Sequence, residues 1–84
     1  MDVKYFKEHI KEELSGVDDY LKQSELAGND EDSQTETSKK FIEMAKQELG
    51  HAKTLYSMFE EHIKSVNDLY DELGKAIRET EDKL

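Results

Sequence analysis

The chain has 84 residues, of which 39% are charged and 35% hydrophobic, and its formal net charge is −9. This length predicts one small domain with little apolar surface for a core, so we expect self-association. The lack of cysteine excludes disulfides, thiolate catalysis and cysteine-ligated metals, while the acidic charge argues against nucleic acid and membrane surfaces as partners.

The composition indicates an all-α protein, because proline is absent, only four glycines occur and apolar residues recur at helical spacing. The first thirteen residues, MDVKYFKEHIKEE, contain no apolar run long enough for a signal peptide or a membrane span. We therefore expect a cytoplasmic, single-domain protein over residues 1–84.

The first predicted helix covers about residues 3–27. Its core-facing stripe is spaced by threes and fours and contains Val3, Phe6, Ile10, Glu13, Val17, Tyr20, Ser24 and Ala27. The residues that follow, GNDEDS at 28–33, combine helix terminators with a polar cluster and predict a turn.

The second predicted helix covers about residues 34–64, and Ser33 with Glu36 forms a capping box at its start. The stripe expected to face the core contains Phe41, Met44, Glu48, His51, Leu55, Met58 and His62. A third apolar stripe with Leu73 and Ile77 predicts helix over about 67–82, either as a separate helix or as an extension of the second. The pattern assigns no role to residues 66–84.

Two carboxylates and an imidazole interrupt these stripes. Glu13 and Glu48 each lie about 14 residues from the predicted turn, or roughly 21 Å along their helices, so an antiparallel hairpin places them opposite each other. His51 lies one turn beyond Glu48 on the same face, because positions i and i+3 are neighbours on a helix.

A bound cation would compensate these charges, since burying an unpaired carboxylate costs about several kcal/mol. Two hairpins related by a two-fold axis make a four-helix bundle that encloses both stripes and brings together two copies of Glu13, Glu48 and His51. The summed charge of the four carboxylates, −4, is balanced by two divalent ions. Mixed carboxylate and imidazole ligation suits iron or manganese and is compatible with zinc, and this ligand pattern is that of di-iron helical bundles.

At these positions the chain resembles the ferritin-like superfamily, and within it the half-length, two-helix members such as encapsulated ferritin. The resemblance rests on EELSGVDDY, residues 12–20, and FIEMAKQELGHA, residues 41–52, and covers roughly residues 5–65. It implies that Glu13, Glu48 and His51 are catalytic metal ligands at a symmetric dimer interface, with Tyr20 beside them. It also implies a di-iron site that oxidises Fe(II) to Fe(III) with oxygen or peroxide, in a homodimer or a higher homo-oligomer.

The tail ETEDKL departs from the apolar extension that loads such proteins into a shell, which puts encapsulation in doubt. Two other interpretations stay open. In the first, the chain is a non-enzymatic helical dimerisation module, and its polar residues specify register or hold a structural or vestigial metal. Alternatively, a dimanganese centre handles peroxide. The residues alone do not distinguish the native metal or the oxidant.

Overall fold

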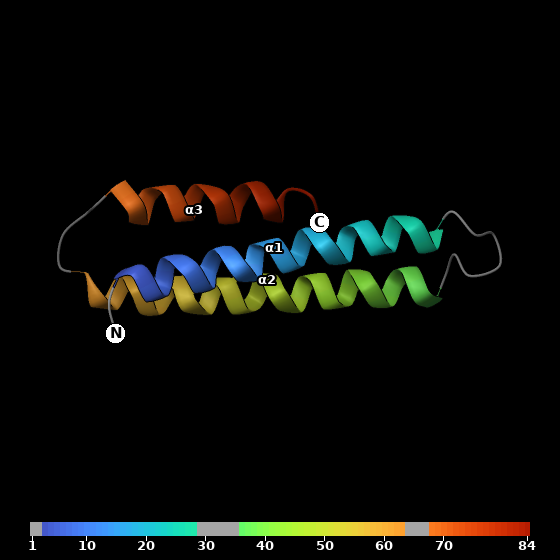
Figure 1. Cartoon of the computed structure of the whole chain (residues 1–84), viewed down its shortest axis with the longest axis horizontal. Helices are drawn as coiled ribbons and strands as arrows, with labels where there is room; N and C mark the ends of the chain where they lie inside the picture. Colours follow the sequence, from blue (N-terminus) through green and yellow to red (C-terminus); the bar gives the residue numbers. More distant parts are fainter. Residues whose placement is uncertain (1–2, 29–35, 64–67) are drawn as a thin grey trace.

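The computed structural model of the chain describes residues 3–28, 36–63 and 68–84. Within these ranges the chain forms three helices and no strand: α1 (Val3–Gly28), α2 (Glu36–His62) and α3 (Asp68–Glu81) (Figure 1). The all-α prediction is confirmed for this part of the chain, and each helix begins and ends within two residues of its expected bounds. The predicted turn after Gly28, with its capping serine, and the junction at 64–67 lie outside the described residues.

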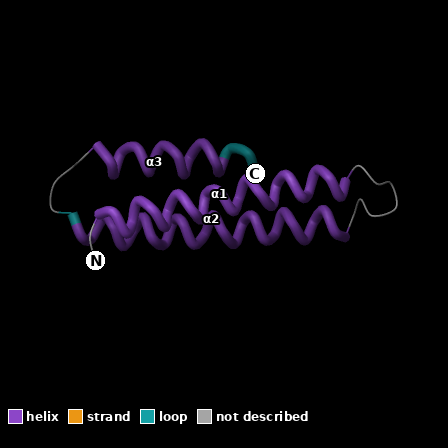
Figure 2. The backbone as a smooth tube through the Cα atoms, in the orientation of Figure 1, coloured by secondary structure: helices purple, strands orange, loops and turns teal. Residues whose placement is uncertain are grey.

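α1 and α2 form an antiparallel hairpin, and α3 folds back along one side of it (Figure 2). α3 starts beside the end of α2 and runs antiparallel to α2, so that the C-terminus lies beside the middle of α1 (Figure 1). The third apolar stripe therefore belongs to a separate helix that packs on the hairpin, and not to an extension of α2.

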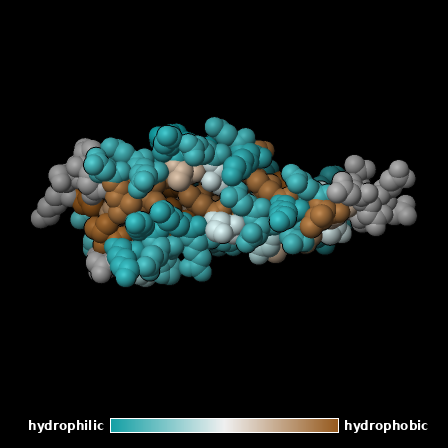
Figure 3. All heavy atoms as spheres, turned by 45° about the horizontal axis from the view of Figure 1, so that its top comes forward, coloured by the Kyte–Doolittle hydropathy of each residue, from teal (hydrophilic) through white to brown (hydrophobic). Residues whose placement is uncertain are grey.

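The core lies where the three helices meet. Its buried apolar side chains are Phe6, Ile10, Leu14 and Val17 of α1, Ala45, Leu49, Ala52 and Phe59 of α2, and Leu73 and Ile77 of α3. The rings of Phe6 and Phe59 stack at 5.4 Å between centroids. In Figure 3, hydrophobic side chains show mainly in a band where α3 lies beside the hairpin, and hydrophilic side chains surround them.

Near the end of α1 and the start of α2, a pair of hydroxyl groups replaces apolar packing. Ser24, predicted to face the core, is buried, and its Oγ lies 2.8 Å from the Oγ of Ser38 on α2. Each hydroxyl also donates to the other residue's backbone carbonyl, at 3.1 and 3.2 Å. Small side chains that satisfy each other let the two helices approach closely.

The sequence prediction was wrong about which stripe of α2 faces α1. Met44 and Met58, expected in the core, are 38% and 41% exposed, whereas Ala45, Ala52 and Phe59 are fully buried. α2 carries two stripes that differ by one position, or about 100° around the helix. α1 packs on the stripe with the alanines, because small residues allow close helix approach, and the stripe with the methionines stays at the surface.

α3 is attached to the hairpin at both of its ends. Near its start, the Tyr56 hydroxyl donates to the backbone carbonyl of Tyr70 at 3.0 Å, and the two rings stack at 4.4 Å. Gly74 makes this contact possible, since a Cβ at that position would clash with the Tyr56 hydroxyl. Two ion pairs hold the other end: Lys83 with Asp18 of α1 at 2.9 Å, and Lys53 of α2 with Glu81.

Candidate metal centre

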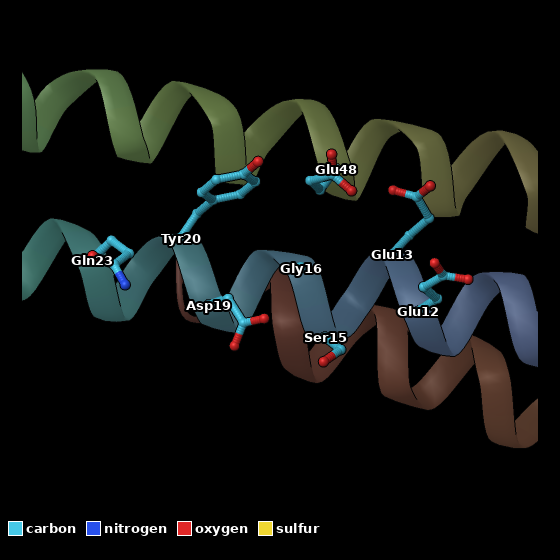
Figure 4. Close-up of a pocket in the computed structure, with 8 residues that line it drawn as sticks. All are labelled: Glu12, Glu13, Ser15, Gly16, Asp19, Tyr20, Gln23 and Glu48. Atoms are coloured by element: carbon cyan, nitrogen blue, oxygen red, sulfur yellow. The ribbon is translucent and has the colours of Figure 1, made fainter.

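The three predicted ligands lie together within one chain. α1 supplies Glu13 and α2 supplies Glu48 and His51, and one ligand atom from each lies within 4.8 Å of the others. The Nδ1 atom of His51 is 3.5 Å from Oε2 of Glu13. In Figure 4, the Glu13 side chain extends from α1 towards α2, on the side from which Glu48 projects. The antiparallel hairpin thus brings the three side chains together, as the equal distances of the two glutamates from the turn imply. The role of these side chains as metal ligands stays a prediction.

The electrostatics of this cluster favour a cation. Oε2 of Glu13 is buried and accepts no hydrogen bond from the described residues. The pKa of Glu48 is raised above its ordinary value of 4.5, first by a side-chain hydrogen bond with Glu13, then by burial and by the Glu13 charge, while His51 acts in the opposite direction. A divalent ion would relieve the burial and the like charge that oppose ionisation of Glu48.

An open cavity of about 580 Å³ leads to the carboxylates. Its lining is Glu12, Glu13, Ser15, Gly16, Asp19, Tyr20, Gln23 and Glu48, and Figure 4 shows them distributed along α1 and the facing side of α2. Glu12 and Asp19 are exposed and line the same cavity as the inner carboxylates Glu13 and Glu48. Carboxylates at the mouth of a cavity raise the local concentration of cations.

Gly16 lets Glu48 lie against α1. A Cβ at this position would be 3.1 Å from Oε2 of Glu48, which is tighter than ordinary contact, and 3.5 Å from its Cγ and Cδ. The sequence analysis missed this residue, although a signal was present. A glycine inside a helical pattern weakens the helix and commonly marks a close approach by another group.

Tyr20 was expected beside the predicted ligands, and it lines the same cavity as Glu13 and Glu48. It is half-buried, and its ring stacks on that of Phe41 from α2 at 6.3 Å between centroids. This contact fixes the ring between the two helices, with its hydroxyl directed towards α2 (Figure 4).

The cluster lies at the surface of the single chain. The side chain of His51 is 63% exposed and that of Glu13 is 25% exposed. One chain therefore supplies three donor groups from one side and leaves the other side open to a further set of ligands, to solvent or to a substrate.

Comparison of the sequence with protein-family models and with curated proteins, and of the structure with solved structures, finds no match. Among the three described helices, none qualifies as a candidate membrane span.

Proposed function

We propose that this chain is a half-length, ferritin-like protein whose symmetric dimer binds Fe(II) and oxidises it to Fe(III). The observation that carries the proposal is the convergence of Glu13, Glu48 and His51 within 4.8 Å, with one carboxylate oxygen buried and without a hydrogen bond. Carboxylate oxygens and an imidazole nitrogen form the donor set of di-iron helical bundles. The residues present thus suit iron as the substrate.

Dimerisation supplies what the single chain lacks. Two copies contribute four carboxylates with a summed charge of −4, which two Fe(II) ions neutralise, and two neutral imidazoles complete the donor set. Apolar side chains on both sides of the cluster, Met44 and Met58 among them, are exposed in the single chain and become buried when the copies pair.

The redox balance of the reaction is simple. Each Fe(II) gives up one electron, so a pair of ions supplies the two electrons that convert O₂ and two protons to hydrogen peroxide, or peroxide and two protons to water. The protein's own residues bind the ions, balance their charge and hold them at a fixed separation. Glu12 and Asp19, at the mouth of the cavity, attract Fe(II) towards the inner carboxylates.

Anaerobic titration with Fe(II), followed by air and monitored by near-ultraviolet absorbance, tests the proposal. We expect a saturable oxidation step at about one ion per chain, because two ions are shared by two copies. Glu48→Ala should abolish this step, and Glu43→Ala, which removes an exposed carboxylate from the same helix, should retain it. Absence of a saturable step in the wild type refutes the oxidase and leaves the dimerisation module.

Elemental analysis of protein purified without added metal separates iron from manganese. Bound manganese, together with peroxide consumption and no Fe(II) oxidation, would support the dimanganese alternative and contradict the proposal.

A further inference from the structure

The α2 helix carries a second stripe, which the rest of the described chain leaves uncovered in whole or in part. Its members are Phe41, Met44, Glu48, His51, Leu55 and Met58. Their separations alternate between three and four residues, which is the 3.5-residue period of a helix that packs along a partner helix. α3 does not compete for this stripe, because it contacts α2 through Lys53 and Tyr56 on another side.

The order of apolar and polar side chains in the stripe is the same from either end of α2. Two apolar residues precede the central Glu48 and His51, and two apolar residues follow them. The midpoint of this pattern lies between Leu49 and Gly50, half a residue from the centre of the helix, since α2 has thirteen residues before Leu49 and thirteen after it. An antiparallel copy placed on this midpoint overlaps α2 over nearly its whole length and matches apolar with apolar positions.

We propose that this stripe is the docking surface for α2 of a second copy, in antiparallel register about the point between Leu49 and Gly50. Phe41 then packs against the partner's Met58, and Met44 against the partner's Leu55. The inference rests on the symmetric dimer of the proposed function, and it adds the helix that forms the seam, its direction and its register. It does not depend on iron oxidation.

The same register brings the two metal clusters together. Glu48 lies opposite the partner's His51, because these two residues are equally far from a point between Leu49 and Gly50. Each copy therefore adds its donors to the open side of the other copy's cluster.

Charges along the outer edge of the stripe select the antiparallel direction. This edge consists of Lys40, Gln47, Thr54 and Glu61, which recur every seven residues and are all exposed. In the proposed register Lys40 faces the partner's Glu61 and Gln47 faces the partner's Thr54, and the two-fold axis repeats each pair. A parallel seam would instead place Glu48 against the partner's Glu48, which like-charge repulsion disfavours, and would separate Lys40 from the partner's Glu61.

Cysteine trapping tests the register directly, because the wild-type chain has no cysteine. The double variant Gln47→Cys/Thr54→Cys should form a covalent dimer under mild oxidation with diamide, and peptide mass spectrometry should find position 47 joined to position 54. Lys39→Cys/Lys46→Cys has the same seven-residue spacing on the side of α2 turned away from the stripe, and should stay uncrosslinked. Links that join 47 to 47, or no links at high protein concentration with and without Zn(II), overturn the proposal.

Charge exchange is the second test. Lys40→Glu and Glu61→Lys should each weaken dimerisation by roughly tenfold at low salt, and the double exchange should restore the affinity. Sedimentation equilibrium measures this affinity, and Lys39→Glu, with the same charge change outside the seam, controls for net charge. A double exchange that is no tighter than the singles contradicts the seam. Cross-linking at 47 and 54 without Fe(II) oxidation would refute only the oxidase, and oxidation without that cross-link would refute only the seam.

Discussion

The repulsion between the two carboxylates of the candidate metal centre should cost the metal-free protein stability at neutral pH. Glu48→Gln keeps the size of the side chain and removes its charge. Two unit charges 4.8 Å apart, the upper limit on the separation between the ligand atoms, repel by about 0.9 kcal/mol at the dielectric constant of water. Because the cluster is open to solvent, this lower value applies better than one for a protein interior. We expect Glu48→Gln to raise the free energy of unfolding by about 1 kcal/mol at pH 7.

The sign of the pH dependence follows from the raised pKa of Glu48. An acid with a higher pKa in the folded chain than in the unfolded chain takes up protons on folding, so stability decreases as pH rises. This decrease begins near the ordinary value of 4.5 and continues until the folded-state carboxyl has ionised. The difference between Glu48→Gln and wild type should therefore vanish near pH 4 and grow towards pH 7.

Urea unfolding followed by circular dichroism, in the presence of EDTA and at several protein concentrations, measures this difference. Glu43→Gln is the matched control, because it removes one exposed charge from the same helix and changes the net charge equally. Excess Zn(II) should reverse the order, stabilising the wild type more than Glu48→Gln. If Glu48→Gln in EDTA is no more stable than Glu43→Gln at pH 7, the carboxylates do not repel as the geometry implies.

Three further outcomes are expected. Tyr56→Phe removes the hydrogen bond to the Tyr70 carbonyl and should lower the free energy of unfolding by about 0.5–1.5 kcal/mol, measured in urea. Gly50→Ala should raise the free energy of unfolding, measured by thermal denaturation, by about 0.5–1 kcal/mol, because a Cβ there meets nothing within 4 Å. Gly16→Ala should gain less, since its Cβ presses on Glu48, and equal gains would contradict that contact. Divalent metal should increase the mass measured by light scattering, because a site divided between copies couples binding to association, and a metal-independent mass would argue against a shared site.

The sequence was most informative where a local rule decides the outcome. Helical spacing of apolar residues and the absence of proline were enough to predict the helical segments, but they left open whether the last segment is a separate helix or an extension of the second. Equal distances from the turn were enough to place Glu13 opposite Glu48, because an antiparallel hairpin converts position along the chain into height along the helix. The adjacency of His51 follows from the i, i+3 relation alone.

The remaining features depend on competition between surfaces that one sequence pattern cannot settle. α2 has two stripes, and the one with Met44 and Met58, which Glu48 and His51 interrupt, was expected to face α1. The structure instead buries the uninterrupted apolar stripe with Leu49 and Phe59, in which Ala45 and Ala52 let the two helices approach closely. The direction of α3 depends on Tyr56 fitting over Gly74, a contact between segments that no local pattern encodes.

The position of α3 also limits how copies of this protein can assemble. α3 occupies one flank of the hairpin, and the flank of α2 that bears Met44 and Met58 keeps apolar side chains exposed. An isologous contact uses the same patch on both molecules and leaves none of it for a third. In the proposed dimer, growth through this flank stops at two molecules, and filaments or rings would need a different part of the surface.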